Sequence, residues 1–316
     1  MTADRIVHIL YENPDWLPPL TAALDGEGLP YRLVEVWQGA LHLDRTPPAG
    51  VWLNRMSPSS HTRGHRESVA LTREILHWLE AHGRRVVNGT AAFRLEISKL
   101  QQDLALRRHG IRTPRTVAGV GRDALIELAK SFDGAFITKH NQGGKGLGIN
   151  LFDDVAAFAA HLESPAFDAG PDGVVVLQQY IAPLGGRITR VELVGGRFLY
   201  AMHSATAEGF ELCPADACQV PAQAPIGEAC PADGGGKFRP APLTGDDPLV
   251  ERYRALCNAE GIEVAGIEFV EDAEGRRYTY DINGTTNYNS AVGREVGVDG
   301  MREVARYLGG LLDRMG

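Results

Sequence analysis

The first 92 residues alternate short apolar segments with helical ones, and this alternation constrains the fold more than any other feature of the chain. Apolar runs at residues 5–11, 31–36, 51–54 and 85–88 predict strands, and the segments 14–28 and 67–82 predict helices. Strands that alternate with helices are typical of parallel sheets. We therefore expect a parallel α/β domain over residues 1–92, built like half of a doubly wound sheet.

The rest of the chain predicts α+β structure. Predicted strands cover residues 135–140, 174–181, 187–194, 197–204, 265–270 and 278–283, and predicted helices cover 91–109, 121–132, 153–162, 248–261 and 299–314. Gly195 and Gly196 stand between two of these strands and predict a two-residue hairpin turn. We expect two α+β units after the first domain, over residues 93–182 and 183–316.

The charge and hydrophobicity of the chain exclude several classes of partner. Its 316 residues carry a net charge of −8, which argues against nucleic acid or an anionic membrane as the main partner. No apolar run reaches the ~20 residues that span a bilayer, and the first residues lack a signal-peptide core. We expect a cytoplasmic homo-oligomer with no nucleic-acid and no membrane partner.

A glycine-rich segment follows the predicted strand at residues 135–140. Its glycines free the backbone to adopt positive φ angles and to bring N–H groups close to an anion. Lys139 lies just before the segment and adds positive charge. The candidate phosphate-binding residues within the segment are Gly143, Gly144, Lys145 and Gly146. The alternative is an ordinary mobile turn.

Two predicted strands near the end of the chain carry acidic residues at matching places. If these strands pair antiparallel through the turn between them, Glu268 lies across from Asp281, and Asn283 emerges on the same face as Asp281. Two carboxylates and an amide oxygen form an oxygen-only set that suits Mg²⁺. The alternative is that Glu268 and Asp281 pair with Arg276 or Arg277.

A polar loop at residues 54–65 follows the third predicted strand. Ligands of open α/β sheets bind at the carboxyl ends of strands, so this loop is a candidate substrate site. Its side chains that could hold a carboxylate or an amine-bearing substrate are Arg55, Ser57, Ser60 and Arg63. The alternative is a capped, solvated loop that leads into a helix.

Two further basic positions are ambiguous. On the predicted strand 187–194, Arg187 and Arg190 point to opposite faces, so one reaches an interior site and the other stays in water. Lys99, taken alone, is an exposed lysine on a helix.

Three cysteines lie in a Pro-, Gly- and Ala-rich segment at residues 207–247: Cys213, Cys218 and Cys230. With His203 or Cys257 they could bind zinc, although no Cys-x-x-Cys pair is present. The alternative is that they are ordinary thiols, and the role of the segment stays open.

The order of these features along the chain resembles the ATP-grasp superfamily, and most closely its RimK-like branch of carboxylate–amine ligases, the ribosomal-protein glutamate ligases. The resemblance runs from about residue 94 to residue 297. It is carried by Lys99, Lys139, the glycine segment 143–148, the strand end 178–181, Arg190, Glu268, Asp281 and Asn283.

The resemblance implies an ATP site with one or two Mg²⁺ ions, for which Mn²⁺ could substitute. Lys99 and Lys139 would contact the phosphates, and the glycine segment would close over them as a lid. Glu268, Asp281 and Asn283 would hold the metal. The adenine would lie against the strand end Gln178, Gln179, Tyr180 and Ile181.

The implied reaction is amide-bond formation. A small-molecule or peptide carboxylate would attack the γ-phosphate of ATP, and an amine would displace the phosphate from the resulting acylphosphate. Arg190 and Lys139 would stabilise the charged intermediates. An ATP-grasp kinase and a nucleotide-binding regulatory protein without turnover remain as alternatives.

The chain departs from the family pattern at positions that bear on the substrate. The family's small-residue–proline–glycine run after the metal-binding asparagine is replaced here by residues 284–288, and an acidic residue expected before Arg190 is replaced by Ile188. The candidate acceptor-binding residues in this region are Thr285, Thr286, Asn287 and Arg294. They could equally cap the next helix, so the identity of the acid and the amine stays open.

Overall fold

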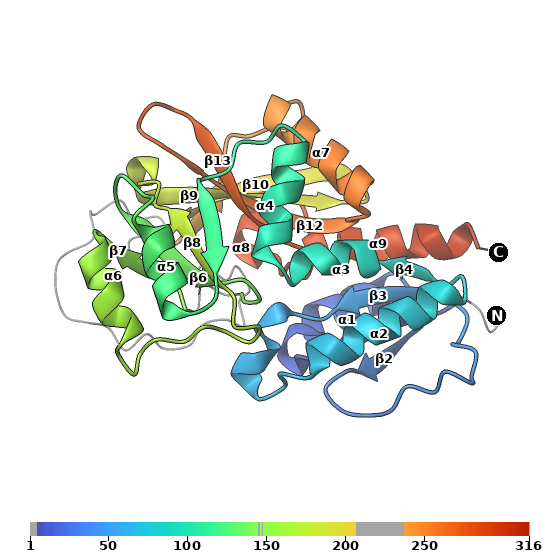
Figure 1. Ribbon diagram of the computed structural model, residues 1–316. Coiled ribbons are helices and arrows are strands. Elements are labelled where there is room, and N and C mark those ends of the chain that lie inside the picture. The colour runs from blue at the N-terminus through green and yellow to red at the C-terminus, as the bar shows by residue number, and fades with distance from the viewer. Residues whose placement is uncertain (1–4, 145, 147, 207–236, 316) are drawn as a thin grey trace.

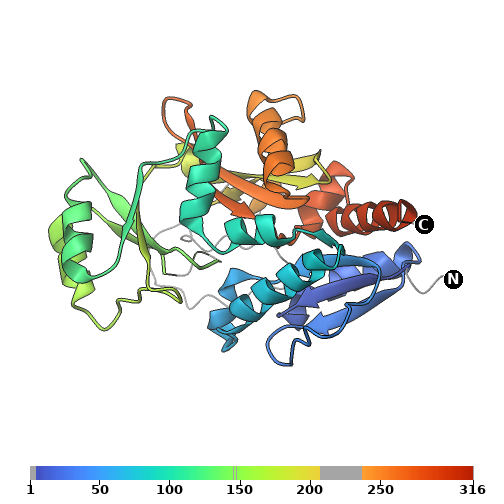
Figure 2. The same cartoon turned by 45° about the vertical axis from the view of Figure 1, so that its right-hand side comes forward.

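The computed structural model describes residues 5–144, 146, 148–206 and 237–315. Its described strands form three sheets of four, five and four strands (Figure 1). The sheet of the first domain and the five-stranded C-terminal sheet lie together, while the central four-stranded sheet projects to one side, as the turned view in Figure 2 also shows. The predicted mixed α/β and α+β fold is therefore confirmed.

The N-terminal sheet is parallel throughout, as the alternation of strands and helices predicts. Its strand order is β2-β1-β3-β4. The strands are β1 (Val7–Tyr11), β2 (Tyr31–Glu35), β3 (Val51–Arg55) and β4 (Arg85–Val87). The helical segments are η1 (Pro14–Trp16), α1 (Pro18–Gly26), η2 (Pro58–Arg63) and α2 (Ser68–Ala81).

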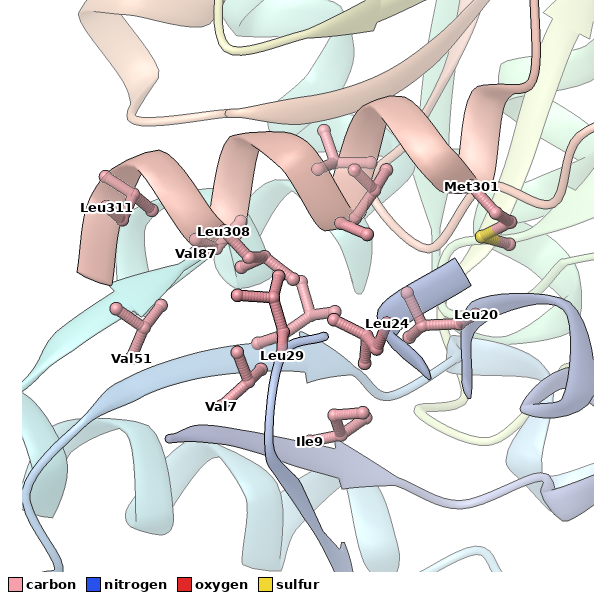
Figure 3. Close-up of a cluster of buried hydrophobic side chains, with 14 of the residues drawn as sticks. Val7, Ile9, Leu20, Leu24, Leu29, Val51, Val87, Met301, Leu308 and Leu311 are labelled. Atoms are coloured by element: carbon pink, nitrogen blue, oxygen red, sulfur yellow. The ribbon is translucent and has the colours of Figure 1, made fainter. Parts of the chain in front are cut away.

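The last helix of the chain, α9 (Gly300–Asp313), packs against this first domain. Figure 3 shows Leu308 and Leu311 of α9 above Val7 of β1, in one apolar cluster with Leu24 of α1. Helix α2 lies in a second apolar cluster with residues of β1 and β3. Burial of both faces explains why the strands of a parallel sheet read as continuous apolar runs.

The central sheet has the order β5-β8-β6-β7 and is antiparallel. Its strands are β5 (Thr116–Gly119), β6 (Phe136–His140), β7 (Asn150–Phe152) and β8 (Val175–Gln179), and its helices are α5 (Arg122–Ala129) and α6 (Val155–Leu162). Phe158 of α6 packs against Phe136 and Phe152 of the sheet. The sequence patterns miss β5 and β7 because strands of three or four residues show little alternation.

The C-terminal sheet has the order β11-β10-β9-β12-β13 and is also antiparallel. Its strands are β9 (Arg187–Val194), β10 (Arg197–Ala205), β11 (Phe238–Pro240), β12 (Val264–Glu271) and β13 (Arg277–Asn283), followed by α8 (Ser290–Val296). Helix α7 (Pro248–Glu260) packs on it. The hairpin turn at Gly195 and Gly196 is confirmed. The short elements η3 (Leu184–Gly186), β11 and α8 were not predicted.

The single helix predicted over residues 91–109 is wrong, because two helices occupy this range: α3 (Thr90–Glu96) and α4 (Lys99–Arg108). Ser98 interrupts them in an extended conformation, and its hydroxyl accepts a hydrogen bond from the Gln101 N–H at 3.3 Å. The side chain of Asn141 accepts a second one, from the N–H of Leu100. Lys99 therefore lies at the start of a capped helix.

Both helices contribute to the core of the C-terminal sheet. Leu95 of α3 and Leu106 of α4 are buried with Ile282 of β13 and Leu256 of α7. The proposed division at residues 92 and 182 remains a prediction. No helix in the described ranges is both long and apolar enough to cross a bilayer.

Candidate active site

A cavity of about 380 Å³ lies where the three sheets approach one another, and it brings together most of the predicted site residues. Those that line it come from the polar loop of the first domain, the glycine segment, the two α+β sheets and the segment after β13. They are Ser57, Lys139, Gly144, Gly146, Gln178, Gln179, Tyr180, Ile181, Arg190, Glu268, Asp281, Asn283, Thr285 and Asn287. Lys99, Gly143, Arg55, Arg63 and Arg294 do not line it. Lys145 lies outside the described residues.

The acidic face of the cavity has the predicted register. Glu268 of β12 lies opposite Asp281 of β13, and Gly266 lies opposite Asn283. The alternative pairing of these carboxylates is wrong, because the two turn arginines are used elsewhere. Arg276 pairs with Asp272, and Arg277 pairs with Asp247 and Glu271.

Arg190 of β9 is held at the centre of this face by three side chains. Its Nε donates to Glu192 at 2.7 Å, its Nη1 to Glu268 at 2.7 Å and its Nη2 to Thr286 at 2.6 Å. Thr286 in turn donates to Glu192 at 3.0 Å. All four side chains are buried. Arg190 is the arginine of its strand that reaches the interior site, whereas Arg187 is only half-buried.

Glu192 is a site residue that was not predicted, although the sequence carries a signal for it. Glu192 lies two residues after Arg190 and therefore on the same face of β9. It places a carboxylate beside Arg190 from two residues after it, whereas the family pattern predicts an acidic residue before Arg190, where this chain has Ile188. Burial raises the pKa of Glu192, against the opposing effect of the Arg190 guanidinium.

Gly266 makes this arrangement possible. It packs directly against the Arg190 guanidinium, and a Cβ atom at position 266 would lie 2.2 Å from Nη2. No other residue type leaves room for the guanidinium there, so β12 carries glycine opposite Glu192, two residues before the Glu268 that lies opposite Arg190.

Two lysines supply positive charge next to the carboxylates. The Nζ of Lys99 pairs with Asp281, so Lys99 is not the exposed helical lysine that its sequence context alone suggests. Lys139 is buried, and its Nζ donates to the Gln178 side chain at 3.0 Å and to the Tyr280 carbonyl at 3.4 Å. Burial and the charge of Lys99 lower the pKa of Lys139 to about 8.

The opposed carboxylates differ in proton affinity. Burial raises the pKa of Glu268. Burial also opposes ionisation of Asp281, but the charges of Lys99 and Lys139 outweigh it and lower its pKa. The cavity therefore carries alternating charges on closely spaced, buried groups, which is typical of sites that bind charged ligands.

Glu96 is a second residue that the sequence analysis missed. It lies at the end of α3, lines the cavity, and accepts a hydrogen bond from the N–H of Gly284, just after Asn283. Burial raises its pKa to about 7. No local signal marked it, because a glutamate on a helix is usually exposed.

Known proteins share this architecture. No protein-family model matches the chain. The solved structure of the D-cycloserine synthetase DcsG matches with a TM-score of 0.68 over 97% of this chain and 99% of that one, at 16% identity. A RimK domain ATP-grasp protein from Sphaerobacter thermophilus matches with a TM-score of 0.65 over 95% and 98% of the two chains, at 18% identity. The chain has the ATP-grasp fold.

Curated sequences point to one branch of that fold. Beta-citrylglutamate synthase B of Danio rerio is 25% identical over 228 residues, which cover 70% of this chain and 51% of that protein. A probable alpha-L-glutamate ligase of Teredinibacter turnerae is 32% identical over 136 residues, which cover 43% and 44%. The chain thus spans about half the length of these relatives. The similarity supports the resemblance to the RimK-like branch of the ATP-grasp superfamily.

The strand end at Gln178–Ile181 forms one wall of this cavity. The N–H of Gln179 already donates to the Arg115 carbonyl at 2.8 Å, and that of Tyr180 donates to the Ala135 carbonyl at 3.1 Å. Among the described residues, the N–H of Ile181 has no hydrogen-bond partner. It is therefore the main-chain donor of this edge that a ligand can use.

The glycine segment lies between the central sheet and the first domain. A Cβ at Gly144 would lie 3.6 Å from Ser59 of η2, so the segment contacts that 3-10 helix. Gly148 has a φ of 73°, and a Cβ there would lie 2.6 Å from the His140 ring. Both the positive φ and the close ring require glycine at this position.

The two arginines of the first domain's polar loop do not line the cavity, although they were predicted to bind substrate. Arg55 is buried and donates to the Thr286 carbonyl and to the Asn287 side chain, each at 2.6 Å. Arg63 forms an ion pair with Glu12, a fully buried residue at the end of β1. Both arginines therefore hold protein groups in this structure.

The remaining predicted residues fall in different places. Thr285 donates to the Met56 carbonyl at 2.8 Å. Arg294 is exposed on α8 and lines a separate cavity. Asn289 caps α8, so the capping alternative applies to a neighbour of the predicted residues. The three cysteines of the predicted zinc site lie outside the described residues, and Cys257 is buried in the core.

The donor set of the acidic face fits a hard divalent cation. Glu268 and Asp281 supply carboxylate oxygens from facing positions, and Asn283 adds an amide oxygen two residues from Asp281. Within the described ranges, no group of three or more His, Cys, Asp or Glu side chains is placed to hold a metal. A cation here would therefore rely on the amide and on ligands from the substrate.

Proposed function

We propose that this chain is an ATP-dependent ligase that joins a carboxylate to an amine of an amino acid or peptide. The observation that carries the proposal is the single cavity that combines Lys139, Arg190 and the face formed by Glu268, Asp281 and Asn283. The names of its sequence relatives, which refer to glutamate ligation and citrylglutamate synthesis, support an amino acid as one substrate.

ATP would enter with its adenine against the strand end Gln178–Ile181, where the N–H of Ile181 is available. Its phosphates would meet Lys139, with Lys99 behind it and the glycine segment above. Glu268, Asp281 and Asn283 would hold one or two Mg²⁺ ions, or Mn²⁺ in their place. Bound metal would neutralise charge on the β- and γ-phosphates. A solved ATP-grasp ligase, PsnB, contains Mg and ADP.

The chemistry would follow in two steps. An oxygen of the donor carboxylate attacks the γ-phosphorus of ATP, the bond from that phosphorus to the bridging oxygen breaks, and ADP leaves. The acceptor nitrogen then attacks the acyl carbon, the bond from carbon to the phosphate oxygen breaks, and phosphate leaves while the amine proton passes to water. Arg190, rigidly held by its three partners, would stabilise the negative oxygen that develops on the acyl group.

The test is a screen of amino acids and short peptides for ATP-dependent phosphate release, with the products identified by mass spectrometry. A product with the summed mass of two substrates less one water supports the ligase. A substrate that gains a phosphoryl group identifies a kinase instead. Phosphate release without an amide product contradicts the proposal.

A further inference from the structure

A second cavity, of about 730 Å³, opens between the start and the end of the chain. One wall consists of η1 and α1 of the first domain, and the other consists of α8 and the beginning of α9. None of the phosphate or metal residues discussed above lines it. It is therefore distinct from the ATP cavity, although it lies beside it.

The two cavities share a wall. Trp16 and Asn287 line both of them, and each side chain is only 8% exposed. Asn287 is held by Arg55 at 2.6 Å, and the Trp16 ring lies under the Arg63 guanidinium at 5.4 Å. Arg55 and Arg63 of the polar loop therefore position the two residues that border both cavities.

Two charged residues of the second cavity, Asp299 and Arg302, already have partners in the protein. Asp299 caps α9 by accepting from the Arg302 N–H at 3.0 Å, and the Arg302 side chain donates to Glu27 at 2.5 Å. The side chains of Asp15 and Arg294 line the same cavity and have no hydrogen-bond or ion-pair partner among the residues that the structure describes. Within the described ranges, an anion and a cation without such partners thus line a single cavity.

The positions of these two charges suggest how a ligand would be oriented in the cavity. Asp15 is the chain neighbour of Trp16, so it lies next to the shared wall. Arg294 lies in the last turn of α8, at the opposite end of that helix from the shared Asn287. A ligand with an amino group and a carboxylate would satisfy both charges, with its amine toward the ATP cavity and its carboxylate toward Arg294.

We propose that the second cavity is the acceptor site of the ligase and that it takes amino compounds bearing a carboxylate, which pairs with Arg294. This inference rests on the proposed ligase function and adds the class of the acceptor. The donor carboxylate is activated in the first cavity, and the acceptor amine reaches it past Trp16 and Asn287.

The experiment compares each L-amino acid with its carboxamide as acceptor, because the pair differs in the carboxylate charge and keeps the amine. A charge-assisted hydrogen bond is worth ~1.5–3 kcal/mol, so kcat/KM for the free acid should exceed that for the amide by ~10–100-fold. Arg294→Ala should reduce this ratio to about one, and Arg294→Lys should retain part of it. Because the ratio is measured within each variant, a change in the amount of folded enzyme cancels.

Arg32→Ala is the matched control, since Arg32 is an exposed arginine on β2 that lines neither cavity. It should keep the full preference for the free acid. An equal rate with acids and amides in the wild type, or an unchanged preference in Arg294→Ala, would overturn the acceptor assignment.

A parallel measurement separates this inference from the ligase itself. Hydroxylamine traps an acylphosphate as a hydroxamate without needing the acceptor site. If the wild type forms a hydroxamate from ATP and a donor acid but shows no preference for acids over amides, the ligase function is supported and the acceptor site is refuted. A complete lack of hydroxamate with every carboxylic acid tested would refute the ligase.

Discussion

Glu268 and Asp281 lie directly opposite each other on β12 and β13, yet their carboxylates engage cations from different parts of the chain. Glu268 accepts from Arg190 of β9, whereas Asp281 pairs with Lys99 at the start of α4. Two like charges this close would repel each other without such partners. The pair thus links the C-terminal sheet to the helix that precedes the central domain, and both carboxylates remain in the cavity wall.

Replacement of either carboxylate by its amide should abolish turnover while the fold survives. Asp281→Asn and Glu268→Gln keep the shape and the hydrogen-bond acceptor but remove the charge that would hold a metal. We expect ATP-dependent product formation to fall by at least ~10²-fold. The measurement is initial rate at saturating Mg²⁺, with circular dichroism to verify folding.

Glu274→Gln is the matched control for this pair, because Glu274 lies in the exposed turn of the same hairpin and pairs with Arg276. It should leave the rate unchanged. Near-normal activity in either cavity variant would mean that the metal ligands are assigned wrongly.

Gly266→Ala adds a single methyl group beside Arg190 and should lower both the stability of the protein and its kcat. The added Cβ would overlap the Arg190 guanidinium, which cannot move freely because Glu192, Glu268 and Thr286 hold it. We expect a loss of ~1–3 kcal/mol in the free energy of unfolding, as for overpacked cores, together with a fall in kcat.

Urea unfolding and steady-state kinetics measure these two effects. Gly134→Ala is the comparison, because Gly134 has a negative φ and open space around its Cα. If Gly266→Ala were as stable and as active as Gly134→Ala, the packing of Arg190 against β12 would not matter for the site.

ATP binding should take up a proton near pH 8 through Lys139. Burial lowers the pKa of the free protein's Lys139 from 10.5 to about 8, so about half of the lysines are neutral at pH 8. The triphosphate favours the charged form and raises this pKa, so binding should take up as much as ~0.5 proton, and affinity should fall as pH rises above 8.

Calorimetric titration in buffers of different ionisation enthalpy measures the uptake. Lys139→Arg should bind ATP without it, because arginine stays charged. Lys130→Arg, an exposed lysine of the same domain that pairs with Glu127, should behave like the wild type. Equal uptake in Lys139→Arg would assign the proton to another group.

Asn88→Ala should destabilise the contact between the first domain and the C-terminal sheet. The Asn88 side chain donates to the carbonyls of Val264 and Gly284 and accepts from the N–H groups of Glu263 and Val264. Loss of these bonds leaves buried main-chain groups without partners, and we expect a cost of ~2–4 kcal/mol in the free energy of unfolding.

Urea unfolding of Asn88→Ala, compared with Asn258→Ala at an exposed position of α7, tests this expectation. A cost below ~1 kcal/mol, the typical value of one ordinary hydrogen bond, would show that water replaces the lost bonds.

The acidic face was predictable because its geometry is local. A short turn joins β12 to β13, so the hairpin brings Glu268 and Asp281 together, and the spacing of two puts Asn283 on the same face as Asp281. The exact pairing of Glu268 with Asp281 also depends on a β-bulge between Glu268 and Phe269, which the residue spacing does not predict. Glu96 was not predictable in the same way. Its carboxylate reaches Gly284, 188 residues further along the chain, and nothing in its own helix marks that contact.

The parallel first domain, the hairpins and the order of the candidate ATP-site residues could all be predicted from the sequence, because side-chain periodicity and turn chemistry act over a few neighbouring residues. Three features appear only in the folded chain: α3 and α4 separate at Ser98, α9 packs on the first sheet, and Asp15 and Arg294 line one cavity. Those features depend on surfaces far apart in the chain that meet by complementary shape and charge, and such complementarity leaves no periodic signal in either segment alone.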